Sequence, residues 1–130
     1  RWLSDWSSDV CSSDLKKAIY STDTELDPAD FDRTPANDSY FRNADALIID
    51  AQYTLEEAIE KRYWGHSSFS LAADFAASWN IKRLILFHHE PAYGDQKVGS
   101  IQNSAAWYLG HMEERGIEVI LAREGLEIDV

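Results

Sequence analysis

Cysteine is nearly absent from this sequence of 130 residues, and long apolar segments are absent altogether. The single cysteine, Cys11, leaves no internal disulfide to form, which suits the reducing cytoplasm. No run approaches the ~18 apolar residues of a membrane span, and the sequence lacks the basic and apolar regions of a signal peptide. We therefore expect a cytoplasmic protein with no membrane partner.

Positive charge is also scarce, with 12 Lys and Arg residues against 23 Asp and Glu residues and a formal net charge of -11. This balance argues against a surface that binds nucleic acid by phosphate neutralisation alone. It is compatible with a small-molecule or phosphodiester substrate, because a bound metal ion can supply positive charge locally. Nucleic acid is left open as a partner without being favoured, and a homodimer is left open as well.

The hydrophobic fraction of 45% is enough for one domain with a core. Residues 1–15 stand apart, because they are rich in Ser and Asp and follow no helical or strand period. Within them the stretch DWSSDVCSSDL (5–15) is what a common short-read sequencing adapter gives when translated in one frame. We interpret residues 1–15 as a disordered, non-native leader and residues 16–130 as the domain, truncated at its N-terminal side. A genuine Ser/Asp-rich leader is the alternative.

From Lys17 onward, expected strands and helices alternate, which predicts an α/β layer architecture. The polar stretch 32–43 is expected to be a loop. Apolar runs predict strands at 18–21, 46–49, 83–87 and 119–121, and capping residues with apolar stripes predict helices at 28–31, 54–61, 68–79 and from about 100 until Gly116 ends it.

Three successive strands in this pattern are followed by ionisable residues, namely Asp23, Asp50 and His88. In α/β folds, ligands collect beyond the carboxyl ends of the strands, where a buried scaffold holds polar groups at the edge of solvent. The sequence therefore predicts a functional site at this edge of the sheet.

Four motifs then carry a resemblance to a known family. They are YSTDTE (20–25), LIIDAQYT (47–54), WGHSSFSLAADFA (64–76) and KRLILFHHEPAY (82–93). In this order they resemble the C-terminal half of metallo-β-lactamase-fold hydrolases, within the branch that holds RNase Z and related phosphodiesterases. The resemblance implies an α/β fold of the αββα sandwich type, of which residues 16–130 hold the C-terminal half.

The family resemblance also implies a cofactor of two divalent metal ions, usually zinc and sometimes manganese or iron. The family's HxHxDH motif is missing, because none of the histidines at 66, 88, 89 and 111 has that spacing. Truncation upstream of Lys16 accounts for this departure. The chain by itself is therefore expected to bind metal poorly and to hydrolyse nothing measurable.

Two residues match metal ligands of the family. Asp23 matches the carboxylate that bridges both ions, and His88 matches the final histidine ligand. The alternatives are a turn aspartate bonded to its own backbone and a surface histidine pair. His89 is the rival of His88, but neighbouring side chains of a strand point in opposite directions, so only one of the pair easily faces the site.

Two further residues match catalytic positions of the family. His66 precedes a helix and matches a histidine that contacts the scissile phosphate or protonates the leaving group, a position that suits anions and titration near neutral pH. Asp50 stands where the RNase Z version has a glutamate and would orient His66. The alternative for both is capping and solvation at a strand end. We expect Asp23 and His88 to converge on a cleft, with His66 and Asp50 at its rim.

The resemblance implies that the intact parent is a dinuclear metal-dependent hydrolase that cleaves a phosphodiester by metal-bound hydroxide. A cyclic nucleotide, an ester, a thioester or a lactam is an alternative substrate, because the fold does not determine the substrate. The alternative function is a non-catalytic sensory or interaction module on a degenerate metallo-β-lactamase fold.

Overall fold

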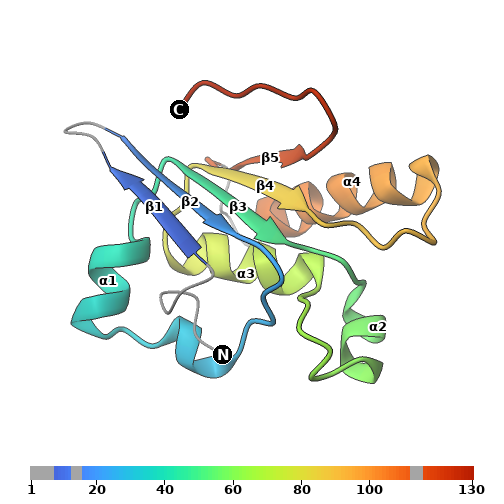
Figure 1. Ribbon diagram of the computed structural model, residues 1–130, viewed down its shortest axis with the longest axis horizontal. Helices are drawn as coiled ribbons and strands as arrows, with labels where there is room; N and C mark the ends of the chain where they lie inside the picture. Colours follow the sequence, from blue (N-terminus) through green and yellow to red (C-terminus); the bar gives the residue numbers. More distant parts are fainter. Residues whose placement is uncertain (1–7, 13–15, 112–115) are drawn as a thin grey trace.

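A single five-stranded sheet forms the centre of the molecule in the computed structural model, which describes residues 8–12, 16–111 and 116–130 (Figure 1). The strands follow chain order across the sheet, and β2 to β5 are parallel while β1 runs antiparallel to β2. Their bounds are β1 (Ser8–Ser12), β2 (Lys17–Ser21), β3 (Ala46–Asp50), β4 (Arg83–Phe87) and β5 (Glu118–Leu121).

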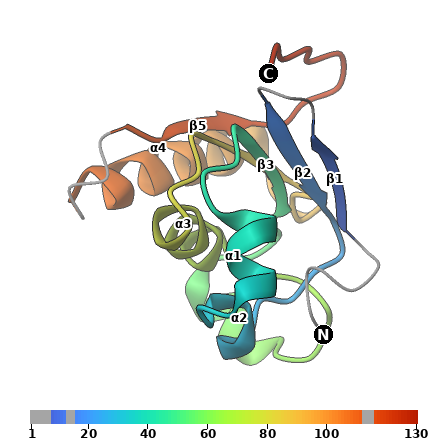
Figure 2. The same ribbon diagram turned by 90° about the vertical axis from the view of Figure 1, so that its left-hand side faces the viewer.

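The helices connect these strands, as the alternating pattern predicts. They are the 3-10 helix η1 (Pro28–Phe31) and the α-helices α1 (Pro35–Phe41), α2 (Leu55–Glu60), α3 (Phe69–Ser78) and α4 (Asp95–His111). Helices α1, α3 and α4 lie on one side of the sheet, and the C-terminal segment 122–130 runs on the other (Figures 1 and 2). The α/β prediction is confirmed. No helix among the described residues is long and apolar enough to cross a membrane.

The core lies between the sheet and its helices. Leu47 and Ile49 of β3, together with Leu84 and Leu86 of β4, are fully buried and belong to this core. The opposite face is more open, since Tyr20 is 44% exposed. The interior of the described fragment is therefore one layer of helices on one face of a sheet.

A cluster of aromatic side chains packs α3 against η1 and α1. Trp79, which is fully buried, packs against Phe41 and Phe75 with ring centroids 5.4 and 6.3 Å apart. Its indole N–H donates to the carbonyl of Asp30 at 3.2 Å, so the buried polar atom has a partner. The guanidinium of Arg33 lies 4.2 Å from the Trp79 ring centroid. Trp79 thus links η1, α1 and α3.

The prediction of a loop over 32–43 is wrong, because this segment contains α1. Thr34 caps the helix by accepting from the backbone N–H of Asn37, and Pro35 occupies its first turn. Most side chains of the segment are polar, which favoured the loop prediction, but the buried Phe41 packs the helix against the core. Helix α4 begins at Asp95 instead of near residue 100, and its predicted end at Gly116 adjoins residues 112–115, which lie outside the described residues.

The leader differs from the prediction of disorder over residues 1–15 in one segment. Ser8–Ser12 forms β1, paired from Ser8 with Ser21 to Ser12 with Lys17. Without β1, β2 would be the edge of the sheet, and an edge strand offers unpaired backbone N–H and C=O groups to any extended segment, whatever its side chains. Residues 1–7 and 13–15 lie outside the described residues. The adapter origin and the boundary at residue 16 stay predictions.

Candidate metal centre

The carboxyl ends of β2, β3 and β4 bring three of the predicted site residues together. The strands are adjacent and parallel, so their ends lie at one edge of the sheet. Asp23 follows β2, Asp50 is the last residue of β3, and His88 directly follows β4. His66 enters the same place from the loop between α2 and α3.

Asp50 is the centre of the cluster. Its side chain is fully buried, and its Oδ2 lies 2.7 Å from Nδ1 of His66 and 2.9 Å from Nδ1 of His88. Its Oδ1 accepts from the backbone N–H groups of Gln52 and Ser67, both at 3.3 Å. A buried carboxylate is costly without partners, and these four groups satisfy both of its oxygens.

Asp23 closes the cluster on the solvent side, where 71% of its side chain is exposed. Its Oδ1 lies 3.5 Å from Nδ1 of His88 and 4.0 Å from Nδ1 of His66. Asp23 and His88 both have a left-handed backbone, with φ of 49° and 58°. This conformation is uncommon for residues other than glycine and is tolerated where the surroundings enforce it. Two such residues therefore meet at one site.

The four side chains form a donor set that fits a divalent metal ion. One ligand atom from each of Asp23, Asp50, His66 and His88 lies within 4.8 Å of the others. Imidazole nitrogens and carboxylate oxygens are the mixed donors that zinc, manganese and iron accept. The cluster is therefore a candidate metal site, while the identity and number of the ions stay predictions.

The surroundings of the cluster carry negative charge. The ring of Tyr53, which is 2% exposed, meets the His66 ring edge-on at 6.0 Å. Burial raises the pKa of the Tyr53 hydroxyl, and the nearby Glu90 and Asp50 carboxylates raise it further. These carboxylates disfavour a further negative charge on Tyr53, and the same charges would favour a bound cation.

The structure separates the neighbouring histidines. His88 joins the cluster, whereas Nε2 of His89 lies 3.2 Å from the carbonyl oxygen of Ala122. The fourth histidine, His111, is exposed and stacks on Trp107 with ring centroids 4.6 Å apart, as expected for a surface residue. Two of the four histidines therefore belong to the candidate site.

One expectation about the site is wrong. Asp50 does not lie at the rim of a cleft; its side chain is fully buried at the centre of the cluster. Despite its short side chain, Asp50 contacts His66 directly. Sequence reasoning also missed the contact between Ser67 and Asp50. Ser68 caps α3 by accepting from the N–H of Leu71, and Ser67 reaches Asp50 through its backbone N–H.

His66 also borders an open, mostly apolar cavity of about 420 Å³. The cavity lies between η1, the segment before it, and α2, and Arg62 is the one cation of its lining. Its apolar lining includes Leu26, Phe31, Ile59 and Leu71. His66 therefore lies between the polar cluster and a space large enough for part of a small substrate.

Comparisons with known proteins agree with this fold. The chain is 32% identical over 83 residues to ribonuclease Z of Bradyrhizobium sp. (strain ORS 278), matching 64% of this chain and 25% of that protein. It is 36% identical over 84 residues to ribonuclease Z of Picrophilus torridus, matching 62% and 24%. Ribonuclease Z of Prochlorococcus marinus (strain NATL2A) is 30% identical over 115 residues, matching 86% and 32%. The chain thus spans about a quarter to a third of the length of these relatives. A comparison with protein-family models finds no match.

Two solved structures share the fold. The metallo-β-lactamase fold protein YhfI of Bacillus subtilis aligns with a TM-score of 0.69 at 18% identity, covering 92% of this chain and 42% of that protein. The short form of human tRNase Z aligns with a TM-score of 0.59 at 24% identity, covering 88% and 33%. These two similarities concern the fold alone, whereas the similarity to ribonuclease Z comes from the sequence relatives above. The chain therefore has the metallo-β-lactamase fold and is similar in sequence to part of ribonuclease Z.

Proposed function

We propose that the protein to which this chain belongs is a metal-dependent hydrolase of phosphodiesters, and that this chain supplies one side of its active site. The observation that carries the proposal is the convergence of Asp23, Asp50, His66 and His88 within 4.8 Å. The names of the sequence relatives, all ribonuclease Z, support the reaction class. No observation favours a non-catalytic module.

Asp23 and His88 are the proposed metal ligands. An ionised carboxylate only accepts hydrogen bonds, so Nδ1 of His88 must carry the proton that it shares with Asp50. In that tautomer the lone pair of His88 is on Nε2, the nitrogen that would hold a metal ion. A histidine held by a carboxylate in this way has a fixed tautomer and ring orientation and is a more basic ligand. When bound, divalent ions activate water and stabilise negative charge on a phosphoryl oxygen.

His66 is the proposed general acid, and Asp50 its positioning partner. By the same argument Nδ1 of His66 donates to Asp50, which leaves Nε2 to exchange a proton with the substrate. His66 borders the apolar cavity, so the leaving group of a substrate in that cavity would lie beside this nitrogen. The hydrogen bond to Asp50 fixes the orientation of the His66 ring.

A phosphodiester is proposed as the substrate class without commitment to RNA. The net charge of -11 weighs against nucleic acid, whereas ribonuclease Z, the name of the relatives, weighs in its favour. Zinc is the proposed metal and two ions the proposed number in the whole protein, because the donors present suit zinc. The cytoplasmic location stays a prediction.

A chimera tests the proposed function. Residues 16–130 would replace the matching segment of the Bradyrhizobium ribonuclease Z, and hydrolysis of bis(4-nitrophenyl) phosphate would be measured with zinc or manganese. We expect turnover that falls by roughly 10²–10⁴-fold in the His66→Ala variant. A folded chimera that binds zinc but does not hydrolyse the diester would contradict the proposal. The parent ribonuclease Z serves as the positive control.

A further inference from the structure

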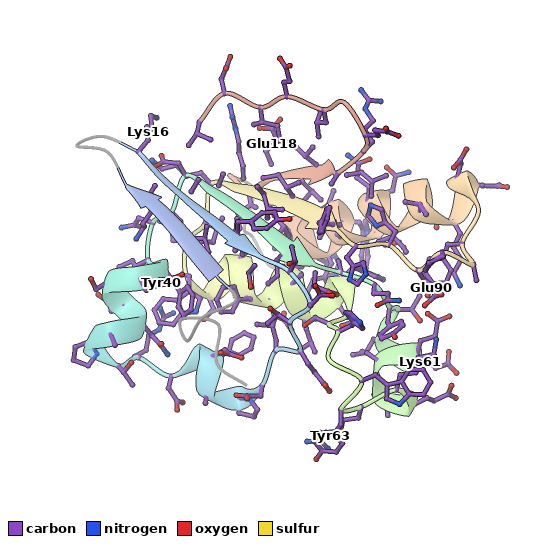
Figure 3. All side chains as sticks on the ribbon, in the orientation of Figure 1. Lys16, Tyr40, Lys61, Tyr63, Glu90 and Glu118 are labelled. Atoms are coloured by element: carbon purple, nitrogen blue, oxygen red, sulfur yellow. The ribbon has the colours of Figure 1, made fainter. Side chains whose placement is uncertain are left out.

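The loop that carries His66 has an unusual backbone. It joins α2 to α3, and within it Tyr63 and Gly65 have left-handed φ angles of 72° and 91°. Tyr63 is 82% exposed and points away from the body of the molecule (Figure 3). Its side chain therefore does not hold this conformation in place, and backbone contacts of the loop must do so.

Glu25 supplies such contacts from a distant part of the chain. Its Oε1 accepts from the backbone N–H of Tyr63 at 2.8 Å, and its Oε2 accepts from the N–H of Gly65 at 3.1 Å. The two oxygens of one carboxylate thus accept hydrogen bonds from the two residues before His66 that have a left-handed backbone. Hydrogen bonds to a charged acceptor are among the stronger ones in proteins.

Ser67 holds the other side of His66 to the same segment. Its hydroxyl donates to the carbonyl of Thr24 at 2.7 Å and accepts from the N–H of Leu26 at 2.9 Å. Its own N–H donates to Asp50. Ser67 is 1% exposed, so these bonds are shielded from water. The residues on both sides of His66 are therefore hydrogen-bonded to residues 24–26.

The same segment carries a predicted metal ligand. Asp23 lies two residues before Glu25, in the turn that follows β2. The position of His66 and the position of Asp23 are thus set by one short stretch of chain. A shift of the His66 loop would break the 2.7 Å contact with Asp50 and remove one imidazole from the cluster.

From these contacts we propose that Glu25 is a positioning residue for the metal centre. Its carboxylate fixes the backbone of Tyr63 and Gly65, and it thereby holds the His66 imidazole against Asp50 and beside His88. The role of Glu25 in metal binding rests on the proposed function, whereas its role in placing His66 does not. The geometry of the two imidazoles provides a readout that needs no metal.

The test compares Glu25→Ala, Glu25→Gln and Glu57→Ala in the 130-residue chain. Glu57 is a matched control, because its carboxylate also accepts a backbone N–H, that of Thr54, but at the start of α2 and away from the His66 loop. The nuclear Overhauser contact between the rings of His66 and His88, whose centroids lie 4.6 Å apart, is measured without metal. Amide hydrogen exchange of Tyr63 and Gly65 is measured in the same samples.

We expect Glu25→Ala to abolish the ring contact, to speed exchange of both amides and to weaken zinc binding by roughly tenfold, the usual effect of losing a supporting partner. Glu25→Gln retains one acceptor oxygen and should restore part of each property, and it replaces Glu25→Ala if the latter does not fold. Glu57→Ala should leave all three unchanged.

Two outcomes would overturn the assignment: retention of the ring contact and slow exchange in Glu25→Ala, or an equal loss in Glu57→Ala. Absence of zinc binding in the unmodified chain would instead count against the proposed metal centre. The ring contact and amide exchange would still decide the role of Glu25 in that case.

Discussion

Asp50 and His66 are in direct contact, with Oδ2 of the carboxylate 2.7 Å from Nδ1 of the imidazole. The same oxygen lies 2.9 Å from Nδ1 of His88. One fully buried carboxylate therefore orients both imidazoles of the cluster. The predictions below follow from this arrangement and from the packing that supports it.

Replacing Asp50 should weaken metal binding, because its carboxylate orients the predicted ligand His88. In Asp50→Asn the side chain keeps its volume but loses its charge, and one of its two terminal atoms becomes a donor. It can no longer accept from both imidazoles and from the N–H groups of Gln52 and Ser67. We expect zinc affinity to fall by roughly 10–100-fold, measured by calorimetry. The control is His111→Ala, which alters an exposed histidine outside the cluster and should bind zinc as the unmodified chain does.

His88 and His89 should differ sharply as metal ligands. His88→Ala removes a cluster member, so saturable zinc binding should be lost. His89→Ala removes only the contact with the carbonyl of Ala122, so zinc binding should persist and stability should fall modestly. Loss of zinc binding in the His89 variant, with retention in the His88 variant, would reverse the assignment.

Asp45 should make stability depend on pH. Its carboxylate accepts from Lys82 Nζ at 2.9 Å and from the Lys17 backbone N–H at 2.7 Å. The Lys82 hydrogen bond, followed by that of Lys17, holds the pKa of Asp45 below its usual range. A depressed carboxyl pKa stabilises the fold above the ordinary Asp pKa of about 4, and the effect is lost as pH falls through the lower folded-state pKa.

The Asp45→Asn variant tests this pH dependence. At pH 7 we expect it to unfold with about 1–2 kcal/mol less free energy than the unmodified chain. The deficit should shrink as the pH falls below about 4 and should vanish below the lower folded-state pKa, where both chains are neutral at this position. Denaturant titrations across the acid range measure the difference, and a deficit that does not change with pH would contradict the electrostatic explanation.

Trp79 should dominate the stability of the helical layer. It is fully buried between α1 and α3, so Trp79→Ala should cost about 3–5 kcal/mol in the free energy of unfolding. Trp107 is 66% exposed, and Trp107→Ala should change stability by no more than about 0.5 kcal/mol. Chemical denaturation followed by circular dichroism compares the two, and similar losses would show that the core is misassigned.

The strands could be predicted from the sequence because each is a local apolar run. The run 46–49 and the run 83–87 consist mostly of buried apolar residues and stop at polar residues, so β3 and β4 needed no long-range information. Helix α1 is different, because burial of Phe41 stabilises a short polar segment. Strand β1 depends on backbone pairing with β2, which side-chain patterns do not encode.

The four residues of the candidate site could be named from the sequence, but their arrangement could not. Adjacent parallel strands bring Asp50 and His88 to one edge, and this follows from strand order. The sharing of Asp50 by two imidazoles depends on where the loop before α3 lies. That loop is held by Glu25 and Ser67 across about forty residues, and no local pattern reports such contacts.

Zinc titration of the 130-residue chain by calorimetry, compared with Asp23→Ala, tests the central claim most directly. The cluster of Asp23, Asp50, His66 and His88 should bind one ion per chain, weakly because it is one side of a larger site, and binding should weaken further without Asp23. Absence of saturable binding would contradict the claim, and so would tight binding of two ions or binding that is unchanged in Asp23→Ala.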